Sequence, residues 1–125
     1  MFMTKWTPDR GRLGKLGESL AVKLLKRQGY QILEKNYRCR FGEVDLIAKE
    51  GEEIVFVEVK SRRGTSFGFP REQISRTKRK HLQRLAQYYM KKQAREMAIR
   101  IDVVAILFDS KGNPLKVETI PNAIF

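Results

Sequence analysis

The sequence predicts an α/β protein in which a mixed five-stranded sheet is flanked by helices, in the order αβββαββ. Three observations lead to this prediction. The apolar residues of Leu13–Gln28 recur with helical spacing, and Gly29 follows where helices commonly end. Between Ile32 and Ser61, short runs of apolar and polar residues alternate as they do in strands. The nearly continuous, β-branched run Ile101–Phe108 is typical of a strand covered on both faces.

The first three predicted strands follow this helix closely along the chain. They cover Ile32–Arg40, Glu43–Lys49 and Glu53–Ser61. A tight turn through Glu50 and Gly51 joins the last two, so we expect these two strands to form a β-hairpin.

The second half of the chain begins with Arg62–Pro70, whose two glycines and terminal proline predict a mobile loop. Phe67 and Phe69 in this loop either stack on bases or pack back on the core. A long helix then starts between Pro70 and Ser75 and runs to about Glu96. The last elements are a turn and a strand, Ser110–Pro114 and Leu115–Ile120.

The length of 125 residues predicts one domain, over residues 12–125, preceded by a flexible arm at residues 1–11. The single cysteine, Cys39, cannot form an internal disulfide, and we expect a partly buried or surface thiol. No secretory signal is visible, and no apolar run approaches the roughly 20 residues that span a bilayer. We therefore expect a soluble, cytoplasmic protein that does not enter a membrane.

The net charge of +12 is concentrated on one stretch of the chain. Between Lys60 and Arg100 there are thirteen lysines and arginines against two acids, Glu72 and Glu96, which makes +11. A clustered basic face is typical of proteins that hold a polyanion by its phosphates. The alternatives are a solvated charged surface and an anionic membrane, and no lipidation motif favours the latter. The expected phosphate contacts are Arg62, Arg63, Arg71, Arg76, Lys78, Arg79, Lys80 and Arg84.

Two of the predicted strands carry carboxylates where the apolar pattern predicts burial. Glu58 and Lys60 alternate with valines and therefore share one face of their strand. With a two-residue turn at Glu50 and Gly51, Asp45 lies opposite Phe56 and diagonal to Glu58, about 7 to 8 Å apart at Cα. Two carboxylates at that distance are able to close on one ion.

Glu18 interrupts an apolar stripe of the first helix. Ala21, Val22 and Leu25 lie three, four and seven residues further on, on the same face. Because a buried charge costs several kcal/mol unless it is paired or bound to metal, we expect Glu18 to face the same polar pocket.

Three carboxylates without a histidine or cysteine partner describe a site for Mg²⁺, with Mn²⁺ as a substitute. Such an ion polarises a phosphate and lowers the pKa of a bound water. Lys60, two residues from Glu58, is placed to assist that water. The predicted chemistry is phosphodiester hydrolysis, with no organic cofactor.

The spacing of Asp45, of Glu58-Val59-Lys60 and of the helical Glu18 resembles the PD-(D/E)XK nuclease superfamily. More closely, the chain is similar to the small bacterial YraN-type proteins described as Holliday-junction-resolvase-like endonucleases. The segments that carry this resemblance are Gly14, Gly17-Glu18, Gly42–Ala48, Val55–Arg62 and Asn122-Ala123.

The resemblance implies a restriction-endonuclease-like core and metal-dependent cleavage of DNA, with branched or junction DNA as the substrate. It implies that Glu18, Asp45 and Glu58 hold the metal, with the Val59 carbonyl completing the shell, and that two copies form a homodimer. Gln73 corresponds in this resemblance to a polar residue that follows the E-x-K element. Val44 stands where the motif's name has proline, which leaves the acids intact.

Other interpretations of the same residues remain open. Asp45, Glu58 and Lys60 would also suit a structural ion pair between strands, in a nucleic-acid-binding protein without activity. An exonuclease that trims single strands is a third possibility. We expect Glu43 to be a solvated strand end rather than a fourth ligand. We expect Asp102 to be a hydrogen-bonded structural group. We expect His81 to contact a phosphate or to be solvated.

Overall fold

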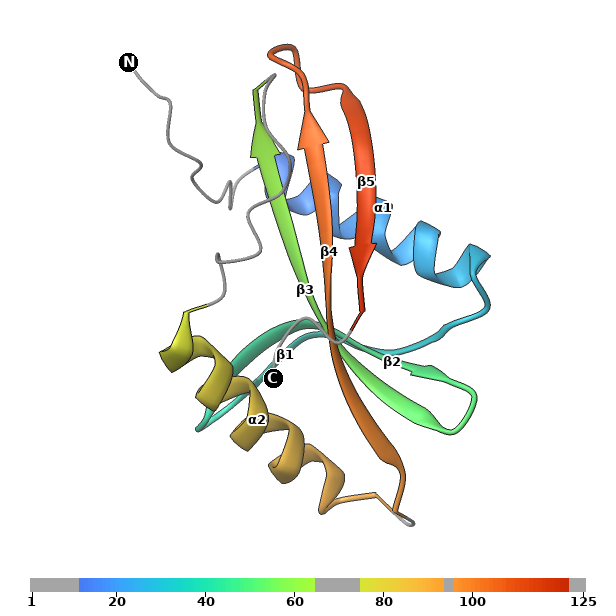
Figure 1. Cartoon of the computed structure of the whole chain (residues 1–125), viewed down its shortest axis with the longest axis vertical. Helices are drawn as coiled ribbons and strands as arrows, with labels where there is room; N and C mark the ends of the chain where they lie inside the picture. Colours follow the sequence, from blue (N-terminus) through green and yellow to red (C-terminus); the bar gives the residue numbers. More distant parts are fainter. Residues whose placement is uncertain (1–11, 65–74, 94–95, 122–125) are drawn as a thin grey trace.

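The computed structural model describes residues 12–64, 75–93 and 96–121 (Figure 1). The predicted fold class and element order are confirmed. The helices are α1 (Arg12–Arg27) and α2 (Arg76–Met90). The strands are β1 (Gln31–Cys39), β2 (Gly42–Glu50), β3 (Glu53–Arg63), β4 (Ala98–Phe108) and β5 (Pro114–Ile120). The predicted arm and Phe67, Phe69, Arg71 and Gln73 lie outside the described residues.

The five strands form one sheet in the order β1-β2-β3-β4-β5, in which β3 and β4 are parallel and the other neighbours antiparallel. The two helices cover opposite faces of it. Phe56 packs in one core with Leu82 and Leu85 of α2. The next residue, Val57, packs in the other core with Leu25 of α1. In the described part of the chain, no helix is long and apolar enough to cross a membrane.

Helix α2 is shorter than the sequence predicts, because it ends at Met90 and not near Glu96. Its last buried side chain is Tyr89. The backbone N–H of Gln93 donates to the carbonyl of Met90, and the Gln93 side chain donates to that of Tyr89 at 3.4 Å. The chain must also leave the helix axis to bring Ala98 beside Glu53, where β4 begins. Local sequence alone does not reveal that constraint.

The hairpin between β2 and β3 turns one residue later than predicted. Glu50 pairs with Glu53, so the turn consists of Gly51, at φ +59°, and Glu52. Phe56 therefore lies opposite Ile47, and the predicted pairing of Asp45 with Phe56 is wrong. The error amounts to two residues of register. Because side chains alternate with a period of two, the paired residues from Leu46↔Val57 to Glu50↔Glu53 keep their predicted faces.

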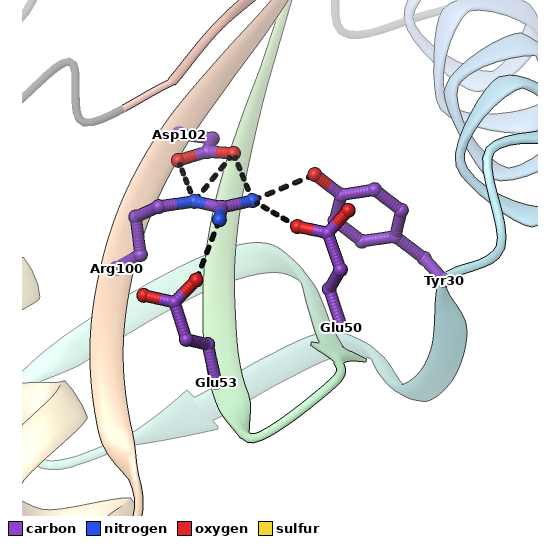
Figure 2. Close-up of polar contacts among 5 residues, drawn as sticks. All are labelled: Tyr30, Glu50, Glu53, Arg100 and Asp102. Carbon is purple, nitrogen blue, oxygen red and sulfur yellow. Dashed lines mark hydrogen bonds and ion pairs between the residues drawn. The ribbon is translucent and has the colours of Figure 1, made fainter.

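A cluster of charges joins the hairpin turn to β4 (Figure 2). The guanidinium of Arg100 donates to Asp102 at 3.0 to 3.2 Å, to Glu53 at 2.8 Å and to Glu50 at 2.9 Å. It also donates to the hydroxyl of Tyr30 at 2.6 Å. Asp102 is 1% exposed and is the hydrogen-bonded structural group that the sequence predicts. This cluster ties the start of β1, the turn and β4 together.

We expect Arg100→Ala to lower the free energy of unfolding by about 3–5 kcal/mol, because it removes the guanidinium that neutralises the buried Asp102 carboxylate. Urea denaturation followed by circular dichroism measures the change. Arg38→Ala is the matched control, since the Arg38–Glu43 pair is largely exposed and should contribute less than about 1 kcal/mol. Equal losses in the two variants would contradict the structural role of the cluster.

Helix α1 approaches β3 closely at Gly17. A Cβ atom added to Gly17 would overlap the hydroxyl oxygen of Ser61, which is 5% exposed. No hydrogen-bond partner of this hydroxyl is found among the described residues. The close approach fixes the height of α1 over the sheet and therefore the position of the next residue, Glu18.

Gly17→Ala should destabilise the protein by about 1–3 kcal/mol, because the added methyl group overpacks a close contact. Ser61→Ala removes the overlapping oxygen, so the double variant should recover much of that loss. A double-mutant cycle of urea denaturation curves measures the coupling. Strictly additive effects of the two substitutions would show that the contact is not the cause.

Candidate active site

The sheet divides near the beginning of β2 and the middle of β3. Paired residues of these strands run from Glu50↔Glu53 to Leu46↔Val57 and no further. Beyond that point β2 stays with β1, whereas β3 continues beside β4 to Arg63. A pocket of about 460 Å³ lies at this division. It is lined from both helices and three strands by Gly14, Lys15, Glu18, Asn36, Arg38, Glu43, Val44, Asp45, Glu58, Val59, Lys60, Ser61 and Lys78.

Asp45 and Glu58 exchange hydrogen bonds across the division. The Asp45 carboxylate accepts the backbone N–H of Val59 at 2.7 Å. In return, the Glu58 carboxylate accepts a hydrogen bond from the backbone of Asp45. The structure thus brings together the two strand acids that the sequence singles out. It does so through backbone groups that lie beyond the last paired residues of β2 and β3.

Both of these carboxyl groups have raised pKa values. Burial is the main cause for Glu58, which is 4% exposed, and the nearby charge of Asp45 adds to it, so that its pKa rises to about 7. Burial likewise raises the pKa of Asp45, against the opposing effects of the Val59 N–H, Lys60 and Lys78. Two lysines therefore only partly offset the cost of holding these charges together.

Glu18 reaches the same pocket from α1, as predicted. Burial raises its pKa most, the charge of Asp45 raises it further, and a side-chain hydrogen bond with Asn36 lowers it. Asn36 lies in β1 between the pairs Lys35↔Leu46 and Tyr37↔Val44, and its φ is +53°. Sequence reasoning missed this residue. The available signal was an asparagine within a strand pattern, since asparagine tolerates the left-handed region.

Lys60 and Lys78 bring positive charge to the pocket. Lys60 lines it from β3, as predicted, and lowers the pKa of Asp45 and of Glu58. Lys78 enters from the first turn of α2, with its Nζ 3.6 Å from a Glu58 oxygen. From the sequence, Lys78 was expected to contact phosphate only. Its place beside the acids depends on how α2 packs, which the local sequence does not specify.

The remaining basic residues are distributed unevenly. Of the expected phosphate contacts, Arg63, Arg76, Lys80 and Arg84 are exposed, and Arg79 is half-buried. Arg62 is 8% exposed, so its side chain presents little surface to a ligand. His81 is exposed on α2, and Glu43 forms an ion pair with Arg38 at 3.0 Å. Cys39 is half-buried, in agreement with the expected partly buried or surface thiol.

The donor set suits Mg²⁺ better than zinc, because the pocket offers carboxylates without thiol or imidazole groups. Within the described ranges, no group of three or more His, Cys, Asp or Glu side chains is placed to hold a metal ion. Mg²⁺ takes one or two protein carboxylates and completes its shell with water and phosphate oxygens. Asp45 and Glu58 supply the two carboxylates of that smaller requirement, and the Val59 carbonyl as a further ligand stays a prediction. The role of Glu18 as a ligand stays a prediction.

The fold and the pocket define an α/β protein with a carboxylate-lined site where its mixed sheet divides. The model of the family described as "Uncharacterised protein family UPF0102" matches residues 17–106. The chain therefore belongs to UPF0102.

Relatives in this family match nearly the whole chain. A UPF0102 protein of Caldicellulosiruptor saccharolyticus is 48% identical over 116 residues, 92% of this chain and 98% of the relative. A UPF0102 protein of Moorella thermoacetica is 45% identical over 118 residues, 94% of this chain and 98% of the relative. The matched family segment contains Glu18, Asp45, Glu58 and Lys60. These names describe a family and give no activity.

The raised pKa of Glu58 predicts a pH-dependent stability in metal-free buffer. The carboxyl group titrates near pH 4.5 when unfolded and near pH 7 when folded, so the folded state holds its proton more tightly. This contribution is fully present below pH 4.5 and is lost as the pH rises to about 7. Relative to Glu58→Gln, the wild type should lose roughly 3 kcal/mol over that range.

Urea denaturation between pH 4.5 and 8, in the presence of a chelator, measures this difference. Glu34→Gln is the control, because Glu34 is exposed and its substitution should leave the pH profile close to that of the wild type. Parallel profiles for the wild type and Glu58→Gln would show that Glu58 titrates normally.

Proposed function

We propose that this protein is a metal-dependent endodeoxyribonuclease that hydrolyses DNA phosphodiesters and selects its substrate by shape, on branched or junction DNA. The observation that carries the proposal is the meeting of Asp45, Glu58 and Lys60 at the division of the sheet, in a pocket open to solvent. The resemblance to the PD-(D/E)XK nucleases supports the same chemistry.

The energetics of the pocket favour a cation as its ligand. Glu58 is buried beside Asp45, and its pKa remains raised although Lys60 and Lys78 lie nearby. A structural ion pair would be expected to stabilise both carboxylates as anions, with lowered pKa values. Carboxylates that remain poorly neutralised are suited to an added positive charge.

In this proposal Asp45, Glu58 and the Val59 carbonyl hold Mg²⁺, or Mn²⁺ in its place, and Glu18 contributes from α1. The ion, when bound, would supply positive charge to the scissile phosphate and acidity to a water molecule. Lys60 would stabilise the attacking hydroxide or help to remove its proton. Water then adds to phosphorus, and the bond to the leaving oxygen of the sugar breaks.

The exposed cations of α2 would hold the DNA backbone beside this pocket. Arg76, Lys80 and Arg84 follow one another at spacings of four residues, so they lie along one side of the helix. Contacts of this kind position the phosphates without reading bases. Phosphate contacts follow the path of the DNA backbone, which favours DNA shape as the selected feature. Cleavage of a branched substrate on two strands would call for two copies of the chain.

Purified protein should cut at least one member of a panel of four-way junction, flap, duplex and single-stranded DNA when Mg²⁺ or Mn²⁺ is present. Glu58→Ala and Lys60→Ala should each reduce the cleavage rate by about 100-fold or more, because they remove a ligand and the group that assists the water. Gel electrophoresis of end-labelled DNA measures cleavage. Fluorescence anisotropy measures affinity, which Lys60→Ala should leave close to normal.

Lys35→Ala is the matched control, because Lys35 is an exposed lysine of β1. Binding without cleavage of any substrate, unaffected by Glu58→Ala, would instead support a nucleic-acid-binding protein without activity. Laddering from strand ends, with closed circular DNA left intact, would support the exonuclease alternative.

A further inference from the structure

The lysine at position 78 occupies an unfavourable place in its helix. Lys78 is in the first turn of α2, which contains no acidic residue, and its backbone N–H donates to the capping Ser75 hydroxyl at 3.0 Å. A cation near a helix N-terminus is disfavoured, because the helix dipole is positive there. Helix stability therefore does not explain a lysine at this position.

The contacts of its side chain do explain it. The Nζ atom of Lys78 donates to the carbonyl oxygen of Glu43 at 3.1 Å and lies 3.6 Å from a carboxylate oxygen of Glu58. The Lys78 side chain is 31% exposed, whereas that of Glu58 is 6% exposed. The ammonium group is thus more accessible to solvent than the buried acid that it faces.

We propose that Lys78 is the pocket's own counter-ion, which competes with a divalent cation for Glu58 and is drawn away when a DNA phosphate binds. This inference rests on the proposed function. It assigns to Lys78 a positioning role that couples two ligands. A distance of 3.6 Å is long for a hydrogen bond, so the lysine holds Glu58 by charge and is able to leave it. A long, flexible lysine side chain suits such a movement.

Electrostatic interactions of Lys78 would couple metal binding to DNA binding. While Lys78 neutralises Glu58, an incoming Mn²⁺ or Mg²⁺ ion meets a positive charge and a partly satisfied ligand. A phosphate offers Lys78 another anionic partner. When Lys78 moves to the phosphate, Glu58 becomes available to the metal ion. By linkage, a cation that displaces Lys78 must in turn strengthen DNA binding by the same factor.

Mn²⁺ binding to the full chain, measured by electron paramagnetic resonance without DNA, tests the competition. Lys78→Met should bind Mn²⁺ on the order of tenfold more tightly than the wild type, within the usual range of such coupling. Lys78→Arg keeps the charge and should resemble the wild type. Lys26→Met, which removes an exposed charge from α1, should change the affinity by less than about twofold, because surface charges are screened.

The second part of the experiment measures DNA affinity by fluorescence anisotropy, with a short duplex that carries phosphorothioate linkages. Mn²⁺ should strengthen DNA binding by the wild type more than by Lys78→Met. Circular dichroism confirms that each variant is folded. A role of Lys78 in holding α2 alone would alter stability without tightening Mn²⁺ binding.

The outcomes separate the two proposals. If the wild type binds Mn²⁺ and Glu58→Gln does not, but Lys78→Met binds no more tightly than Lys26→Met, the counter-ion role is wrong and the metal site stands. If the wild type binds no Mn²⁺, or Glu58→Gln binds it equally well, the proposed metal site is wrong and the counter-ion role falls with it.

Discussion

The exchange of hydrogen bonds between Asp45 and Glu58 is the interaction on which the site depends. Where β2 leaves β3, backbone groups lose their neighbouring strand, and a buried N–H without an acceptor costs about 1–3 kcal/mol. The Asp45 carboxylate supplies the acceptor for Val59, and Glu58 does so for Asp45. The same two side chains therefore satisfy backbone groups at the division and supply two of the four carboxylates that line the pocket.

This double role limits what a substitution can reveal. An alanine at Asp45 or Glu58 removes a candidate ligand and also a backbone acceptor, so a loss of activity alone would not identify a ligand. An amide keeps an oxygen acceptor while it removes the charge, which makes glutamine at position 58 the more informative variant. The amide variants address charge, and the alanine variants address charge and folding together.

The sequence predicted much of the fold because its signals are local. Helical spacing and strand alternation placed all seven elements, and the face of Glu58 survived a register error of two residues because side chains alternate with a period of two. The end of α2 and the turn at Gly51 depend on tertiary pairing and were misplaced. Asn36 and Lys78 reach the pocket through packing of separate elements, so their roles became visible only in three dimensions.

The carboxylates near the start of β3 are neutralised more completely than Glu58, which lies further along the same strand. At its start, one guanidinium, that of Arg100, makes short hydrogen bonds to three carboxylates and leaves its side chain 12% exposed. Further along, Glu58 has a lysine at 3.6 Å that is itself partly exposed, and its pKa is raised to about 7. An arginine fork would bind such carboxylates more firmly than a lysine. A fold that needed charge at position 58 only for stability would be expected to satisfy it as completely as at Arg100. Lys78 and Lys60 together leave the pKa of Glu58 raised, and the proposed divalent cation would account for this incomplete neutralisation.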